Sequence, residues 1–214
     1  LVEERAQAGA VIGVSDGDTV AAVAAAVRRA RSTDVDVVSL IGGVGAPQIP
    51  SHSSEVCRTL ATGLGGRAWQ LPVPAIVDGA EAAAHLKATS TVGAVFDLMG
   101  RANLALVGIG AINPLATVFR HGVIPSDKIE AIATAGAVGT ICGWFYGPRG
   151  ALIPTEFDDR TLSVSPRVLQ RVPMRLGVAM HATKAPAIKA ALVGGWINAV
   201  GLDAETAEEL LRIM

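Results

Sequence analysis

The sequence predicts an α/β fold with a doubly wound, mainly parallel sheet, helices on both faces and a small antiparallel extension. Short apolar segments such as GAVIGV (9–14) alternate with amphipathic ones, as strands buried on both faces alternate with helices. Loops with glycine or small polar residues join them. One stretch, 136–153, is instead rich in aromatic residues and glycines, which is typical of an antiparallel hairpin.

The composition fits one globular domain of 214 residues with a core of Val, Ile, Leu and Ala. Half of the residues are hydrophobic, 17% are charged and 4% are aromatic. The formal net charge is −1 and no Lys/Arg block occurs, which argues against nucleic-acid binding by this chain itself. Cys57 and Cys142 lie far apart in apolar contexts, so we expect reduced core residues. Neither a membrane-spanning run nor a signal pattern is present, so we expect no membrane partner and a cytoplasmic location.

The first half of the chain is predicted to alternate strands and helices. Extended segments are expected at 9–14, 35–43, 67–79 (interrupted by prolines) and 103–110. Helices are expected at 19–31, 53–63 (behind Ser53), 80–88 and 91–101. In the first of these helices, Arg28, Arg29 and Arg31 suit the negative end of the helix dipole.

The second half contains the hairpin and then returns to the strand–helix pattern. Ser126 is predicted to cap a helix to about residue 134, and a Gly-Pro-Arg-Gly turn belongs to a small lobe at about 136–164. Strands are expected at 175–180 and 197–202. Helices are expected after the caps Ser165 (with Pro166 following), Thr183 (ending at Gly194-Gly195) and Asp203.

Four loops at the carboxyl ends of predicted strands carry glycine or small polar residues: 15–19, 42–45, 108–111 and 181–184. Ligands of parallel sheets lie at this edge, where glycine permits close approach and helix N–H groups attract anions. Each loop alone could be an ordinary turn, but four such loops at one edge of the sheet favour a binding site for a small polar ligand. Lys184 is predicted in the first turn of a helix, where its charge opposes the dipole. Lys184 could therefore contact an anionic group of the ligand, or it could be an ordinary lysine that is exposed to solvent.

The turn GVSDGDTV (13–20) could be an anion site, a sugar site or only a tight turn. Gly17 and Thr19 offer donors there. Asp16 and Asp18 are good acceptors for sugar hydroxyls and poor neighbours for a dianion, so any phosphate is expected nearer Lys184.

Several familiar kinds of site are missing from the sequence. It lacks the dinucleotide and Walker fingerprints, metal-ligand spacing among its histidines and cysteines, and a G-x-S-x-G elbow. We therefore expect no cofactor, no metal and no catalytic residue. The segment TEFDDRTLSV (155–164) holds adjacent carboxylates that could accept sugar hydroxyls or transfer protons, or could form a solvated turn.

Three segments, DLMGRANLALVGIG (97–110), GAVGTICGWF (136–145) and the run from TEFDDR (155–160) to the last helix, resemble the effector-binding domain of the SorC family of bacterial transcriptional regulators. VVSLIGGVG (37–45) and LPVPAIVD (71–78) also match in order. The resemblance implies a fold similar to sugar-phosphate isomerases and CoA transferases, and binding of a sugar or sugar phosphate without turnover. It also implies a homodimer or homotetramer and a helix-turn-helix DNA-binding domain N-terminal to this chain. The first residues, LVEERAQAG, lack an initiator Met, so we expect that domain to lie outside the chain.

The resemblance also implies the ligand-binding residues. They are Asp16, Gly17, Asp18, Thr19, Gly42, Gly43, Gly108, Gly110, Asp158 and Lys184. Here Asp16 replaces an aromatic residue of the family's W-G-x-T turn, and MHATK (180–184) replaces a more glycine-rich loop. Both departures bear on whether the ligand is phosphorylated. The alternatives are a sugar-phosphate isomerase on the related fold, although NLALVGIGAIN (103–113) lacks the carboxylate such an enzyme needs, and a structural oligomerisation module.

Overall fold

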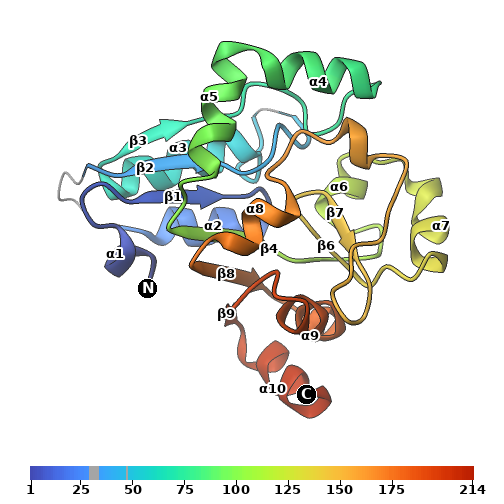
Figure 1. The fold of residues 1–214 in the computed structure, drawn as a ribbon. Helices are drawn as coiled ribbons and strands as arrows, with labels where there is room; N and C mark the ends of the chain where they lie inside the picture. Colours follow the sequence, from blue (N-terminus) through green and yellow to red (C-terminus); the bar gives the residue numbers. More distant parts are fainter. Residues whose placement is uncertain (29–33, 47) are drawn as a thin grey trace.

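Within residues 1–28, 34–46 and 48–214, which the computed structural model describes, six strands form one parallel sheet (Figure 1). They are β1 (Val11–Val14), β2 (Asp36–Ser39), β3 (Arg67–Trp69), β4 (Leu104–Gly108), β8 (Met174–Ala179) and β9 (Ala199–Leu202). Their order across the sheet is β3-β2-β1-β4-β8-β9. The chain therefore winds outward from β1 in one direction and from β4 in the other, as a doubly wound sheet does.

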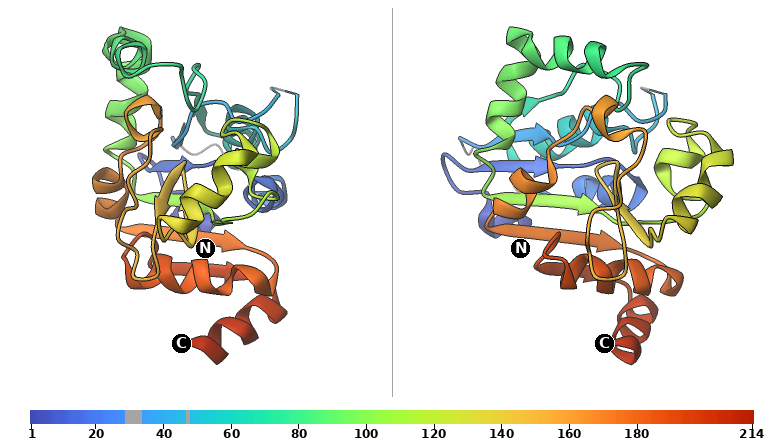
Figure 2. Two further views of the ribbon diagram at one scale, coloured as in Figure 1. Left: turned by 90° about the vertical axis from the view of Figure 1, so that its right-hand side faces the viewer. Right: turned by 45° about the vertical axis from the view of Figure 1, so that its right-hand side comes forward.

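Helices cover both faces of this sheet, and the alternation of side chains along each strand explains why. On β1, Ile12 packs in the cluster that contains α2 (Asp18–Ala26) and α3 (Ser53–Leu64). The neighbouring Val11 packs in the opposite cluster, with α5 (Ser90–Met99), α8 (Pro166–Arg171) and α9 (Ala185–Val193). The left view of Figure 2 shows α5 and α8 on one side of the sheet and α2 on the other. The remaining α-helices of the main layer are α1 (Val2–Arg5), α4 (Ala80–Ala88) and α10 (Ala204–Ile213).

A small antiparallel sheet extends the structure, as the sequence predicted. Its strands are β5 (Gly110–Ala111), β6 (Gly139–Ile141) and β7 (Trp144–Tyr146). Cys142 and Gly143 turn between β6 and β7 with φ of 51° and 80°, the two positive values that a tight hairpin turn of the primed type needs. The helices α6 (Thr117–Arg120), η1 (Ser126–Lys128) and α7 (Ile129–Thr134) complete this region.

This extension has a hydrophobic cluster of its own, centred on Phe119 and Phe145, whose ring centroids lie 6.1 Å apart. The cluster includes Ala116, so its residues begin earlier in the chain than the expected lobe at 136–164. In Figure 1 and in the right view of Figure 2, the arrows of the parallel strands point towards α6 and α7. The extension therefore stands at the carboxyl ends of the sheet.

Most predicted elements are confirmed, but several in the first half are shorter than expected, among them one helix and one strand. The helix expected over 19–31 ends at Ala26, because Val27 has extended backbone angles of −69° and 126°. Arg28 lies beyond its end, and Arg29 and Arg31 lie outside the described residues. The strand expected over 35–43 pairs as a strand only at Asp36–Ser39. After it, single bridges pair Ile41 with Ser163 and Gly43 with Pro74.

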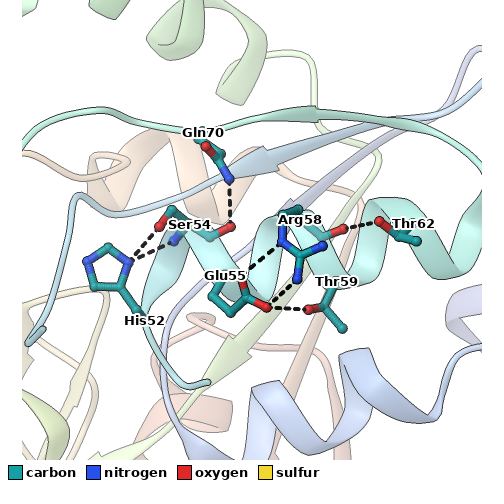
Figure 3. Close-up of polar contacts among 7 residues, drawn as sticks. All are labelled: His52, Ser54, Glu55, Arg58, Thr59, Thr62 and Gln70. Atoms are coloured by element: carbon teal, nitrogen blue, oxygen red, sulfur yellow. Dashed lines mark hydrogen bonds and ion pairs between the residues drawn. The ribbon is translucent and has the colours of Figure 1, made fainter. Parts of the chain in front are cut away.

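The predicted cap of α3 was off by one residue. His52 is the N-cap, and its Nδ1 accepts a hydrogen bond of 3.3 Å from the Ser54 N–H (Figure 3). Ser53 is instead buried, and its hydroxyl donates to the Gly42 carbonyl at 3.0 Å. The serine thus fastens the helix to the segment that follows β2, and the histidine satisfies the free end of the helix. Figure 3 also shows Arg58 paired with Glu55 along the same helix.

The caps of the second half are partly as predicted. Ser165 accepts from the Val168 N–H, and Asp203 accepts from the Thr206 N–H, so both cap their helices. Thr183 is not a cap, because it lies inside the short turn η3 (Ala182–Lys184) that precedes α9. Ser126 likewise begins the turn η1 before α7, and α6 was not anticipated.

Two smaller expectations concern the cysteines and the membrane. Cys57 and Cys142 are both buried and free, as predicted. In the described ranges, every helix is too short or too polar to cross a membrane.

Candidate functional site

A cavity of about 440 Å³ lies at the carboxyl ends of β1, β4 and β8, next to the point where the strand order reverses. Its walls come from residues 16–20 after β1, 108–111 after β4, 180–184 after β8, the hairpin at 140–143 and the segment 113–120 around α6. The volume falls in the range of small-molecule sites. Three of the four loops predicted from the sequence therefore meet in one cavity.

The loop after β1 supplies backbone donors. Gly17 is the N-cap of α2 with φ of 109° and ψ of 154°, a conformation that only glycine adopts without strain. Its N–H donates to the Ser51 carbonyl at 3.0 Å, which fixes the turn. Asp18, Thr19 and Val20 form the first turn of α2 and line the cavity. The first N–H groups of a helix have no partner within it, so they carry partial positive charge towards this space.

Charged side chains of both signs line the cavity. Arg120 of α6 lies 2.8 Å (Nη1 to Oδ2) from Asp18. Arg120 and the hydroxyl of Ser51 both hydrogen-bond this carboxylate, and they hold the pKa of Asp18 below its usual value. Lys184 also lines the cavity, and its pKa is lowered by burial first, with Asp18 opposing this effect and Arg120 adding to it.

Asp16 lines the same cavity and is half-buried. Burial, together with the nearby charge of Asp18, raises its pKa from 3.8 to about 6, although a backbone hydrogen bond acts in the opposite direction. A carboxyl group with this pKa is ionised at neutral pH and is an acceptor for hydroxyl groups.

The hairpin of the small sheet contributes a buried hydroxyl. Thr140 is 6% exposed and lines the cavity, and its Oγ1 has no hydrogen-bond partner among the described residues. Buried polar groups in proteins are nearly always hydrogen-bonded, so a hydroxyl of this kind at a cavity wall is a candidate ligand contact. Gly110 lies opposite, and a Cβ there would stand only 2.7 Å from Thr140 Cγ2.

Of the residues implied by the resemblance, seven line the cavity: Asp16, Gly17, Asp18, Thr19, Gly108, Gly110 and Lys184. Gly42 and Gly43 do not line it. They follow β2, where an added Cβ would stand 2.5 Å from the Pro74 carbonyl oxygen or 2.7 Å from His52 Nε2, so close packing accounts for both glycines. Asp158 does not line it either, because it accepts a 2.7 Å hydrogen bond from the Thr155 hydroxyl in a local turn.

The sequence reasoning missed Arg120, Thr140 and Cys142, which all line the cavity. Thr140 and Cys142 lie in the segment predicted as a hairpin, but nothing in the sequence placed that hairpin against the parallel sheet. Arg120 ends a four-residue helix that is too short to show a periodic pattern. Across the described part of the chain, no group of His, Cys, Asp and Glu has the arrangement of a metal site.

The cavity therefore combines hydroxyl acceptors, ammonium and guanidinium donors and backbone N–H groups, with apolar walls at Val20, Ile109 and Val178. This is the chemistry that recognises a small polyhydroxylated molecule.

Known proteins match this chain along nearly its whole length. A family model described as "Putative sugar-binding domain" matches residues 1–212. The Erythritol catabolism regulatory protein EryD of Brucella abortus is 32% identical over 203 residues, covering 94% of this chain and 63% of that protein. The Deoxyribonucleoside regulator of Bacillus subtilis is 27% identical over 211 residues, covering 99% of this chain and 67% of that protein. The chain thus spans about two thirds of the length of these relatives.

A solved structure of a known regulator has the same fold as this chain. The full-length sorbitol operon regulator SorC of Klebsiella pneumoniae superposes with a TM-score of 0.88 at 25% identity, covering 99% of this chain and 73% of that one. The predicted fold class and the resemblance to the SorC regulators are confirmed by these matches.

Proposed function

The chain belongs to the Sugar-bind family of sugar-binding domains, and we propose that it is the effector-sensing domain of a sugar-responsive transcriptional regulator. It binds a sugar, a sugar alcohol or a phosphate of one of these, and releases it unchanged. The single observation that carries this proposal is the cavity at the strand-order reversal, which is lined by the acceptor Asp16, the donor Lys184 and Thr140, whose buried hydroxyl has no partner among the described residues.

The relatives support the class of effector. Their names refer to erythritol, to deoxyribonucleosides and to sorbitol, and each of these molecules carries several hydroxyl groups. A molecule of this kind needs alternating donors and acceptors at short spacing, which carboxylates, hydroxyls and ammonium groups supply together. A cavity of about 440 Å³ is large enough for such a molecule.

In the complete regulator, a helix-turn-helix domain N-terminal to this chain contacts DNA, and the protein acts in the cytoplasm as a homodimer or homotetramer. The effector acts by population shift, because it binds one state of the assembly more tightly than the other. A coupling free energy of about 1–3 kcal/mol changes operator affinity roughly 5- to 150-fold.

A thermal-shift screen of sugars and sugar alcohols, each paired with its phosphate, tests the proposal. An effector at about 100 times its dissociation constant stabilises the domain by about 2.7 kcal/mol. The same samples are followed by NMR, and the sugar is expected to remain unchanged. The absence of a shift across a panel that includes erythritol, sorbitol and 2-deoxyribose would contradict the proposal, and so would conversion of any panel member.

A further inference from the structure

Asp18 brings a carboxylate to the start of α2, where its side chain is 63% exposed. It lies in the first turn of α2, next to the N-cap Gly17, where helix N–H groups favour negative charge. Arg120 Nη1 is 2.8 Å from Asp18 Oδ2, and Ser51 hydrogen-bonds the same carboxylate. Lys184 lies near enough for Asp18 and Arg120 to affect its charge. A helix start with an arginine and a lysine nearby favours an anion, and here a carboxylate of the chain itself pairs with the arginine.

The charges that line the cavity are balanced without a ligand. Among the described lining residues, the carboxylates are Asp16 and Asp18, and the lysine and arginine are Lys184 and Arg120. A phosphate dianion at the start of α2 would meet both carboxylates within a few ångströms. Like charges this close repel each other, which disfavours a phosphate at this position.

A second part of the cavity indicates a ligand that is rich in hydroxyl groups. Thr140, on the small sheet, lines the same cavity, and its buried hydroxyl has no partner among the described residues. It is a neutral donor and acceptor, which suits a hydroxyl group. The cations of the site are thus balanced by carboxylates of the chain, while the hydroxyl of Thr140, a neutral polar group, has no partner in the described structure.

We propose that Asp18 is a built-in counterion that fills the anion subsite at the start of α2, so that the effector is an uncharged sugar or sugar alcohol and not a sugar phosphate. This inference rests on the proposed function, since it names the effector class of the same cavity. Asp18 is then the residue that determines specificity, because it accepts hydroxyl groups and repels phosphate.

Inorganic phosphate tests the subsite directly, without knowledge of the effector. We expect Asp18→Asn to bind inorganic phosphate at least about tenfold more tightly than the wild type, measured by titration calorimetry at constant ionic strength. Asp18→Ser is the second variant, since serine is well tolerated at a helix start. Asp97→Asn is the matched control, because it removes an exposed carboxylate of α5 outside the cavity and is expected to behave as the wild type.

The thermal-shift screen of sugars and sugar alcohols, each paired with its phosphate, gives a second test. With the wild type, we expect an uncharged sugar or sugar alcohol to raise the melting temperature and its phosphate ester to have no effect. With Asp18→Asn, we expect the phosphate ester to raise the melting temperature as well. Tighter wild-type binding of the ester than of its parent, or no gain of phosphate binding in either Asp18 variant, overturns this inference but leaves the proposed function standing. A panel in which neither parents nor esters bind contradicts the proposed function itself, while the phosphate titration still decides the role of Asp18.

Discussion

Gly110 and Thr140 face each other across the pairing of β5 with β6, so closely that a Cβ at Gly110 would stand 2.7 Å from Thr140 Cγ2. Gly110→Ala therefore pushes Thr140 out of position. We expect this variant to lose about 1–3 kcal/mol of stability and about tenfold in affinity for the stabilising sugar. Thermal unfolding and titration calorimetry measure the two effects.

A double variant separates the clash from other causes. Adding Thr140→Ser removes Cγ2 and keeps the hydroxyl, so Gly110→Ala/Thr140→Ser is expected to recover most of the lost affinity. Failure of this rescue would show that the position of Thr140 is not what Gly110 protects.

Gly17 shapes the loop that carries Asp16 and Asp18. Its φ of 109° with ψ of 154° is a region reserved for glycine, so Gly17→Ala is expected to cost about 1–3 kcal/mol and to weaken sugar binding. Gly79→Ala is the matched control. Gly79 is also a helix N-cap, with φ of −152° and open space at its Cβ position, so little change is expected there in unfolding experiments. Equal losses in both variants would contradict this account of Gly17.

The pKa of Asp16 predicts a pH-dependent stability. Because it is raised from 3.8 to about 6, the folded state keeps its proton between these values while the unfolded chain releases it. The free energy of unfolding therefore falls as pH rises through this window, and ionised Asp16 destabilises the fold above it. Asp16→Asn is expected to be more stable than the wild type by about 1–3 kcal/mol near pH 7.5, with the gain vanishing near pH 4. Denaturant unfolding of both proteins across this range is the measurement, and a gain independent of pH would refute it.

Trp196 provides a prediction for stability alone. It is buried, it is not one of the residues that line the cavity, and its Nε1–H donates to the Gly150 carbonyl at 2.7 Å. Trp196→Phe removes this hydrogen bond and leaves a buried carbonyl without its partner, at an expected cost of about 1–3 kcal/mol. The dissociation constant of the sugar, measured well below the melting temperature, should stay as in the wild type. A large loss of affinity would mean that this contact reaches the site.

The strand–helix alternation could be predicted from the sequence because each element carries its own signal. The apolar run at 9–14 and the Ser165-Pro166 start are local patterns, and the structure confirms both. The exact cap of α3 could not be predicted, because Ser53 was drawn into the core by its bond to the Gly42 carbonyl. His52 is therefore the N-cap of α3, and the position of this cap depends on the tertiary contact of Ser53.

The individual loops of the candidate site could be predicted from the sequence. Which of these loops meet in one cavity depends on the order of the strands in the sheet, which the sequence did not show. The loops after β1, β4 and β8 meet because these strands are neighbours, whereas Gly42 and Gly43 follow β2, on the far side of β1. Arg120 reaches Asp18 from the short helix α6 of the antiparallel extension, and a contact between residues so far apart in the chain leaves no local pattern. Lys184 was expected in the first turn of a helix, either near an anionic group or solvated; the structure places it at the N-cap of α9, where it lines the cavity.

Thr140→Val tests the central claim, that this cavity binds the sugar effector, most directly. The substitution replaces a buried hydroxyl without a partner in the described structure by a methyl group. We predict unchanged or higher stability of the free protein, because an unsatisfied buried group is removed, and at least about a tenfold loss of sugar affinity by titration calorimetry. Wild-type affinity in Thr140→Val, with the sugar still stabilising the protein fully, would contradict the account.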